Sequence, residues 1–164
     1  MTRGKYRRIL GLDPGTGIFG FGVVEIRSGQ PKMIDGGVIT TPAHTPLPER
    51  LEEIYTTIRD LIEELQPDEV VIEKLFFTRN ITTGISVAEA RGVAMLAAHQ
   101  ARLPIHEYNS NQIKQSLTGY GQAKKFQVQE MVKEALGLKE IPKPDDAADA
   151  LAAAITHYLM TRFD

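Results

Sequence analysis

The stretch from residue 7 to 17 constrains the fold most, because a short apolar run in it ends abruptly at a carboxylate followed by a tight turn. The apolar run at residues 9–12 is typical of a buried strand that is covered on both faces. Pro14 ends the strand, since proline cannot donate a hydrogen bond to a sheet. Asp13 therefore lies at the edge of a sheet, where it either serves chemistry or merely caps a hairpin turn.

The hydrophobic patterns of the segments that follow this turn predict a sheet with helices. Two β-rich segments at 18–26 and 32–40 follow Asp13 closely, and together with the first strand they indicate an antiparallel meander. Further along, the sequence predicts a small-residue helix at 82–102, a short strand at 105–108, a short helix through Leu117 capped by Asn109 or Ser110, and an alanine-rich helix from Asp145 to about Thr161.

A second carboxylate ends the strand that is predicted after the meander. Apolar residues recur at intervals of three and four between residues 47 and 65, which predicts an amphipathic helix. Residues 69–73 then form an apolar run that ends at Glu73. A helix between two apolar strands is a β-α-β arrangement, so the strands run parallel. If they are neighbours, Asp13 and Glu73 emerge at the same edge of the sheet.

Three further acidic residues, Asp145, Asp146 and Asp149, open the final helix. Helix capping and the helix dipole explain Asp145 well, because negative charge is favoured at a helix N-terminus. They explain less well why Asp146 and Asp149 are three residues apart, a spacing that puts both on one face.

Asp13, Glu73, Asp146 and Asp149 each lie at the end or start of an apolar element. Carboxylates gathered in one place repel one another, and a divalent cation relieves that repulsion. Oxygen ligands without cysteine or an evident histidine cluster favour Mg²⁺ or Mn²⁺ over zinc.

The segment from residue 114 to 143 is basic and contains a glycine-containing loop at 119–121. Such a segment suits contacts with phosphate groups. A solvated helix face is the alternative for Lys133 and Lys139. The lysines of the segment are Lys114, Lys124, Lys125, Lys133, Lys139 and Lys143.

Length and composition limit the class of protein. The 164 residues fit a single domain, and the net charge of −2 hides an uneven distribution of basic residues. The absence of cysteine excludes disulfides and Cys-ligated zinc. No apolar run reaches membrane-spanning length, so we expect no membrane association and a cytoplasmic location.

These residues together resemble the RuvC family of bacterial Holliday-junction resolvases along nearly the whole chain. The resemblance rests on the order and spacing of motifs that are individually weak. They are Gly11-Leu12-Asp13-Pro14-Gly15, Ile72-Glu73 with Phe76 shortly after, Lys114-Gln115, Lys125-x-Gln127-Val128-Gln129, and Asp146-Ala147-Ala148-Asp149-Ala150-Leu151-Ala152.

The resemblance implies a ribonuclease-H-like α/β fold, with a five-stranded mixed sheet flanked by helices. It also implies that Asp13, Glu73, Asp146 and Asp149 are catalytic and hold two Mg²⁺ ions, with Mn²⁺ as a substitute. The implied partners are a four-way DNA junction, a second copy of the chain in a homodimer, and a branch-migration complex of RuvA and RuvB. Lys74 stands where the family pattern leads us to expect glutamine, and it either touches DNA or faces solvent.

The same interpretation assigns the DNA contacts to Phe76, Arg79, Lys114, Lys124 and Lys125. Phe76 lies three residues beyond Glu73, so its side chain lies near the carboxylates. We expect it to stack on an unpaired base and hold a junction open, while Phe77 packs in the core. Burial of both rings in the core is the alternative.

Two rival functions follow from the same residues. The segment 13–17 also resembles the first phosphate loop of the actin, Hsp70 and sugar-kinase ATPases, but those proteins need a second lobe for which this chain is too short. The second rival is a junction-binding protein that does not cut. Retention of all four carboxylates argues against it, because negative charge that faces phosphates weakens binding.

Overall fold

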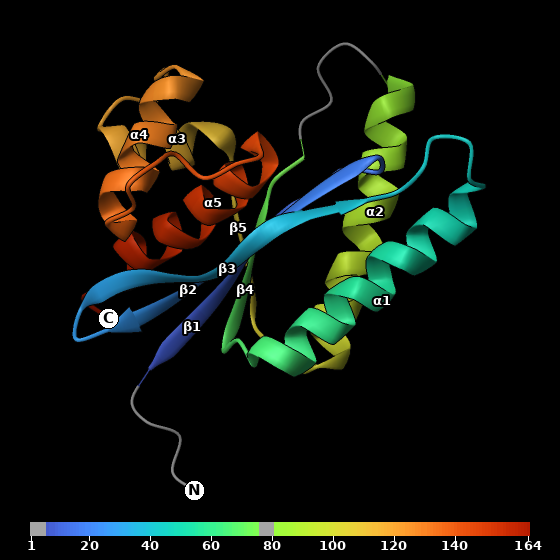
Figure 1. Ribbon diagram of the computed structural model, residues 1–164, viewed down its shortest axis with the longest axis horizontal. Coiled ribbons are helices and arrows are strands. Elements are labelled where there is room, and N and C mark those ends of the chain that lie inside the picture. Colours follow the sequence, from blue (N-terminus) through green and yellow to red (C-terminus); the bar gives the residue numbers. More distant parts are fainter. Residues whose placement is uncertain (1–5, 76–80) are drawn as a thin grey trace, which may run out of the picture.

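The computed structural model describes residues 6–75 and 81–164, which form a five-stranded mixed sheet with helices on both faces (Figure 1). The strands lie in the order β3-β2-β1-β4-β5. Their bounds are β1 (Arg7–Asp13), β2 (Ile18–Arg27), β3 (Gln30–Thr40), β4 (Glu69–Glu73) and β5 (Ile105–Tyr108). The first three strands are the antiparallel meander that the sequence predicts, whereas β1, β4 and β5 run parallel.

The helices divide between the two faces of the sheet. Helices α1 (Leu47–Leu65) and α2 (Ile81–Gln100) cover one face, and α3 (Ser110–Thr118), α4 (Lys125–Leu136) and α5 (Asp145–Thr161) cover the other (Figure 1). The ribonuclease-H-like architecture expected from the sequence is therefore confirmed. Among the described residues, no helix combines the length and apolarity needed to cross a bilayer.

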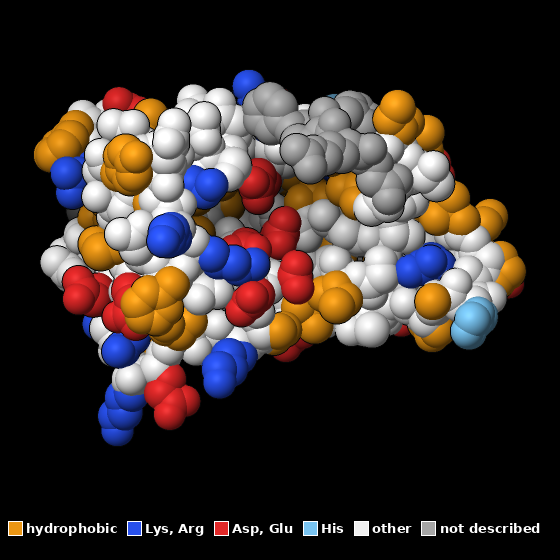
Figure 2. All heavy atoms as spheres, turned by 90° about the horizontal axis from the view of Figure 1, so that it is seen from above, with side chains coloured by type: hydrophobic (Ala, Val, Ile, Leu, Met, Phe, Trp, Pro, Cys, Tyr) orange, Lys and Arg blue, Asp and Glu red, His pale blue; other side chains and the backbone are white. Residues whose placement is uncertain are grey.

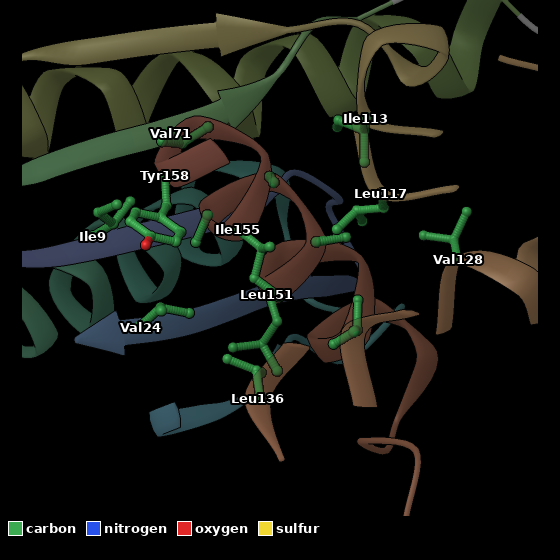
Figure 3. Close-up of a cluster of buried hydrophobic side chains, with 14 of the residues drawn as sticks. Ile9, Val24, Val71, Ile113, Leu117, Val128, Leu136, Leu151, Ile155 and Tyr158 are labelled. Atoms are coloured by element: carbon green, nitrogen blue, oxygen red, sulfur yellow. The ribbon is translucent and has the colours of Figure 1, made fainter. Parts of the chain in front are cut away.

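Strand β1 is buried on both faces, as its apolar run predicts. Leu10 and Leu12 belong to the core under α1 and α2, whereas Ile9 belongs to the core under α5. In that second core, side chains of α5 meet those of the central strands (Figure 3): Leu151, Ile155 and Tyr158 with Ile9, Val24 and Val71. Alternation along the strand then directs Asp13 to the face that α5 covers.

Most predicted element boundaries hold within two residues. The helix predicted at 47–65 has those bounds, and the helix predicted at 82–102 is α2, which begins at Ile81 and ends at Gln100. Asn109 caps α3, since its side chain accepts from the backbone of Gln112 at 2.8 Å. Helix α4 was not delimited from the sequence, where it appeared only as part of the basic segment.

Candidate active site

Asp13 and Glu73 are the last residues of neighbouring parallel strands. Strand pairing places Leu12 opposite Ile72, so the two carboxylates leave the sheet at the same edge. Both side chains are half-buried on the face covered by α5. The arrangement is the one that the β-α-β pattern predicts, and it excludes a simple hairpin cap as the whole explanation of Asp13.

Asp146 and Asp149 come from the first turns of α5, which approaches the sheet very closely. A Cβ added at Gly20 of β2 would lie 2.1 Å from the carbonyl oxygen of Asp146. Gly20 is also paired with Asp13 across the β1–β2 ladder. Because Gly20 has no side chain, the N-terminus of α5 can lie directly over the edge of the sheet at which Asp13 emerges.

Asp145 does not cap α5, contrary to the sequence interpretation. The N-cap residue is Pro144, and no side chain caps the helix there. Asp145 instead accepts from Gln129 Nε2 at 3.1 Å and pairs with Lys125 Nζ at 3.4 Å. Both partners belong to α4, so contacts between helices have replaced the local cap.

The structure brings the four predicted carboxylates together at one edge of the sheet, where three of them line a cleft. Oxygen atoms of Asp13, Asp146 and Asp149 lie within 4.8 Å of one another. Glu73 lies beside them, between a part of the cleft lined by Asp13 and a part lined by Asp149. Figure 2 shows acidic side chains gathered near the centre of this face of the molecule, with lysine and arginine side chains next to them.

Burial and repulsion between neighbouring carboxylates raise the pKa values of Asp13, Glu73 and Asp149. Burial, together with Asp149, Glu73 and Asp146, raises the pKa of Asp13 to about 8. Burial and Asp149 raise the pKa of Glu73, and burial raises that of Asp149 despite the nearby Lys125. Asp13, which holds a proton near neutral pH, and the neighbouring half-buried carboxylates fit a hard divalent cation, which would replace that proton.

The raised pKa of Asp13 predicts how stability depends on pH without metal. The folded state keeps a proton on Asp13 that the unfolded chain loses near pH 3.8, so stability falls as pH rises from about 4 to 8. At pH 8 in EDTA, Asp13→Asn should therefore melt roughly 4–8 °C above wild type, for a gain of about 2 kcal/mol. Thermal melts at pH 4 and pH 8 measure the effect.

The two proteins should melt within about 2 °C of each other at pH 4, where the unfolded chain has only begun to lose the Asp13 proton and little of the stability difference has developed. Saturating Mg²⁺ at pH 8 should stabilise wild type more than the variant. A lower melting temperature for Asp13→Asn at pH 8 in EDTA would contradict the repulsion inferred here.

Two of the predicted DNA-contacting lysines line the cleft. Lys125 begins α4 and its Nζ lies 3.4 Å from carboxylate oxygens of both Asp145 and Asp149. Its burial lowers the lysine pKa, but the two aspartates outweigh that effect and raise it, so the side chain is charged. Lys114 of α3 lines the Asp149 side of the cleft, and Lys124 is exposed just before α4.

Phe76 and Arg79, like Phe77, lie outside the described residues, so the predictions made for them stay predictions. Lys74 is described: its side chain is exposed and lines the Asp13 side of the cleft. That position is open to a phosphate that enters the cleft as well as to solvent.

Sequence reasoning missed one cation of the cleft, Arg91. It lies on α2, lines the Asp13 side and pairs with Glu107 of β5. Its Nε is buried and has no hydrogen-bond partner among the described residues, and burial lowers its pKa. The signal in the sequence was an arginine inside a helix made mostly of small and apolar residues.

The mixed sheet, with carboxylates at the ends of two parallel strands and at the start of the last helix, defines an α/β protein of the ribonuclease-H-like class. Comparison with known proteins gives the particular family. The sequence profile described as "Crossover junction endodeoxyribonuclease RuvC" matches residues 9–157. The chain belongs to the RuvC family.

Individual relatives agree with this assignment. The crossover junction endodeoxyribonuclease RuvC of Chloroflexus aurantiacus is 53% identical over 150 residues, which cover 92% of each chain. The solved structure of Thermus thermophilus RuvC has a TM-score of 0.89 at 35% identity and covers 94% of this chain and 95% of that one. T. thermophilus RuvC in complex with a Holliday junction substrate has a TM-score of 0.86 at 34% identity, with 95% of both chains covered.

Proposed function

We propose that this chain, acting as one nuclease domain, resolves Holliday junctions by paired symmetric incisions in two opposing strands. The products are 5′-phosphate and 3′-hydroxyl ends that a ligase can seal, as recombination and repair require. The observation that carries the proposal is the convergence of Asp13, Asp146 and Asp149 within 4.8 Å, beside Glu73, in a member of the RuvC family.

The four carboxylates would hold two Mg²⁺ ions, with Mn²⁺ as a substitute. When bound, such ions activate a water molecule and stabilise the leaving 3′ oxygen of a phosphodiester. The carboxylates come from β1, β4 and α5, three elements packed in one core, so they orient the cations rigidly. Lys114 and Lys125, which line the cleft beside Asp149, would offset the negative charge of the scissile phosphate.

The decisive experiment compares two DNA substrates of matched sequence. Purified protein is incubated with a synthetic four-way junction or with a linear duplex, each with and without Mg²⁺. We expect symmetric nicks in the junction only, and only with the cation. Equal cutting of the duplex would contradict a structure-selective resolvase, and binding without cutting in Mg²⁺ would favour the rival junction-binding function.

The nucleotide-binding alternative has its own test. Residues 13–17 would have to hold a nucleotide phosphate, but the carboxylates beside them repel it. We expect no measurable ATP binding by calorimetry, and micromolar binding would revive this alternative.

We also propose a C2 homodimer with one active site in each subunit, because a four-way junction has two-fold symmetry. Three exposed apolar side chains along α2 support this arrangement: Ile81 at 69% exposure, Ile85 at 50% and Leu96 at 48%. Docking with a branch-migration complex of RuvA and RuvB, and a cytoplasmic location, belong to the same proposal.

Lys125 is the DNA contact with the clearest test. Lys125→Ala removes an ammonium that can neutralise one phosphate, so junction binding should weaken about 3–10-fold, and the slope of log K against log salt should fall by about one. Binding titrations from 50 to 200 mM salt with a catalytically inactive background measure both quantities.

Lys139→Ala is the matched control, because Lys139 is exposed and follows α4 at its far end from the cleft. It should leave the slope unchanged. An unchanged slope for Lys125→Ala, together with full cleavage activity, would return Lys125 to the role of a solvated helix residue.

A further inference from the structure

A second group of metal-binding side chains lies away from the acidic cleft. It comprises Glu69 of β4, His106 of β5 and His157 of α5, each offering one ligand atom within 4.8 Å of the others. Glu69 is at the opposite end of β4 from Glu73. His157 lies two helical turns beyond Asp149, or about 12 Å at ~1.5 Å per residue, so the two groups are separate.

The Nε2 atoms of the two histidines have no hydrogen-bond partner among the described residues. His157 is 1% exposed, and within the described ranges neither its Nε2 nor the buried Nε2 of His106 meets one. These atoms lie 3.5 Å and 3.7 Å from the two carboxylate oxygens of Glu69, too far for a well-formed hydrogen bond. A buried polar atom left this way costs free energy unless a ligand binds it.

A hydrogen bond on the far side of His157 presents its Nε2 to the carboxylate. Tyr108 Oη lies 2.8 Å from His157 Nδ1. When Nδ1 carries the proton and donates it to Tyr108, Nε2 holds a lone pair that faces Glu69. Burial and His106 lower the pKa of His157, which favours this neutral ring.

We propose that Glu69, His106 and His157 bind a divalent transition-metal ion of the Zn²⁺, Co²⁺ or Ni²⁺ class. Ligand bonds of ~2.0–2.1 Å in a tetrahedral site place neighbouring ligand atoms about 3.4 Å apart. His106 Nε2 lies 3.7 Å from Glu69 Oε1, close to that spacing, and one ligand atom of each of the three residues lies within 4.8 Å of the others, so small side-chain rotations bring all three onto one ion. Two imidazoles and one carboxylate favour these metals over Mg²⁺, which prefers oxygen. Water would complete the coordination.

The neighbours of the group limit its affinity. Arg7 donates to Glu69 Oε2 through Nε at 2.8 Å, which leaves Oε1 for the ion but places a positive charge beside it. The two imidazole rings are stacked, with centroids 4.0 Å apart and planes 25° from parallel. A rotation of the part-exposed His106 ring is needed to aim both lone pairs at one ion, so we expect micromolar rather than nanomolar binding.

The ion would add a direct link between α5 and the paired strands β4 and β5. β4, β5 and α5 each supply one ligand, so binding stabilises the folded state and raises the melting temperature. The site is structural, since the acidic cleft with its own cations lies elsewhere on the same elements.

The test titrates the full chain with Zn²⁺ and with Co²⁺ in millimolar Mg²⁺, and follows both the melting temperature and the visible absorption of Co²⁺. Wild type should bind one ion with a micromolar Kd, melt several degrees higher and show the spectrum of low-coordinate Co²⁺. Glu69→Gln and His106→Gln should each weaken binding at least about tenfold. His99→Gln, at an exposed histidine of α2, should change nothing.

Asp13→Asn separates this site from the cleft and should keep the Zn²⁺ binding of wild type. Loss of binding in Asp13→Asn but not in His106→Gln would assign the ion to the cleft and overturn the proposal. Absence of any shift with Zn²⁺, Co²⁺ or Ni²⁺ in wild type would overturn it as well. His106→Gln changes a part-exposed side chain, so a folded variant is expected for the comparison.

Discussion

Asp13→Asn and Glu73→Gln should each cut a four-way junction about 10³-fold more slowly than wild type, while binding it as tightly or more tightly. Each change would remove a negative ligand from the proposed cation site but preserve the shape of the side chain, so the chemical step should slow. In the proposed function, binding rests on basic residues such as Lys114 and Lys125, which line the cleft, and it should become tighter when a charge that repels phosphate is lost. Single-turnover cleavage and gel-shift titrations measure the two effects separately.

Asp145→Asn provides the matched control for this experiment. Asp145 is adjacent to Asp146 in the first turn of α5, but it pairs with Gln129 and Lys125 of α4 and lies outside the group of three converging aspartates. Its cleavage rate should stay within about fivefold of wild type. Near wild-type cutting by Glu73→Gln would refute the assignment of Glu73 to the site.

Gly20→Ala should lower the free energy of unfolding by about 3 kcal/mol or more and abolish most cleavage. The new methyl group would lie 2.1 Å from the carbonyl oxygen of Asp146, so α5 must move off the sheet. That movement displaces Asp146 and Asp149 from Asp13. Denaturant unfolding, with cleavage assayed under conditions where the variant is still folded, measures stability and activity independently.

Gly92→Ala is the control, because a Cβ at Gly92 of α2 meets nothing within 4 Å. Alanine is the better helix former there, so this variant should be neutral or up to about 1 kcal/mol more stable. If Gly20→Ala unfolds within about 0.5 kcal/mol of Gly92→Ala, the close approach of α5 does not determine the geometry of the site.

The strand part of the site could be predicted because its geometry is simple. Two apolar strands joined by a helix run parallel, and a carboxylate at the end of each must then appear at one edge. Asp13 and Glu73 follow this rule. The spacing of Asp146 and Asp149 likewise placed both on one helix face, although only the packing of α5 against Gly20 shows that this face meets Asp13.

The remaining contacts depend on residues far apart in the sequence. Asp145 resembled a helix cap, but its partners Lys125 and Gln129 lie on another helix, which local preference does not reveal. The basic residues of 114–143 mask the pattern that predicts α4. That pattern is the spacing of four between the apolar residues Val128, Val132 and Leu136. Glu69, His106 and His157 come from three elements and share no motif.

If the aspartates bind a cation and Lys125 contacts DNA as proposed, the pairing of Lys125 with Asp149 should make the binding of metal and of DNA cooperative. One ammonium group, 3.4 Å from the carboxylate, cannot neutralise Asp149 and a phosphate at the same time. A cation bound among the aspartates takes over the negative charge that Lys125 now balances, which frees the lysine for the DNA backbone. By thermodynamic linkage, DNA must then tighten cation binding by the same factor by which the cation tightens DNA binding. The active arrangement, with the cation among the aspartates and Lys125 on the DNA backbone, would therefore form fully only when cation and DNA are both bound. Lys125→Ala should uncouple the affinity for the cation from the affinity for DNA.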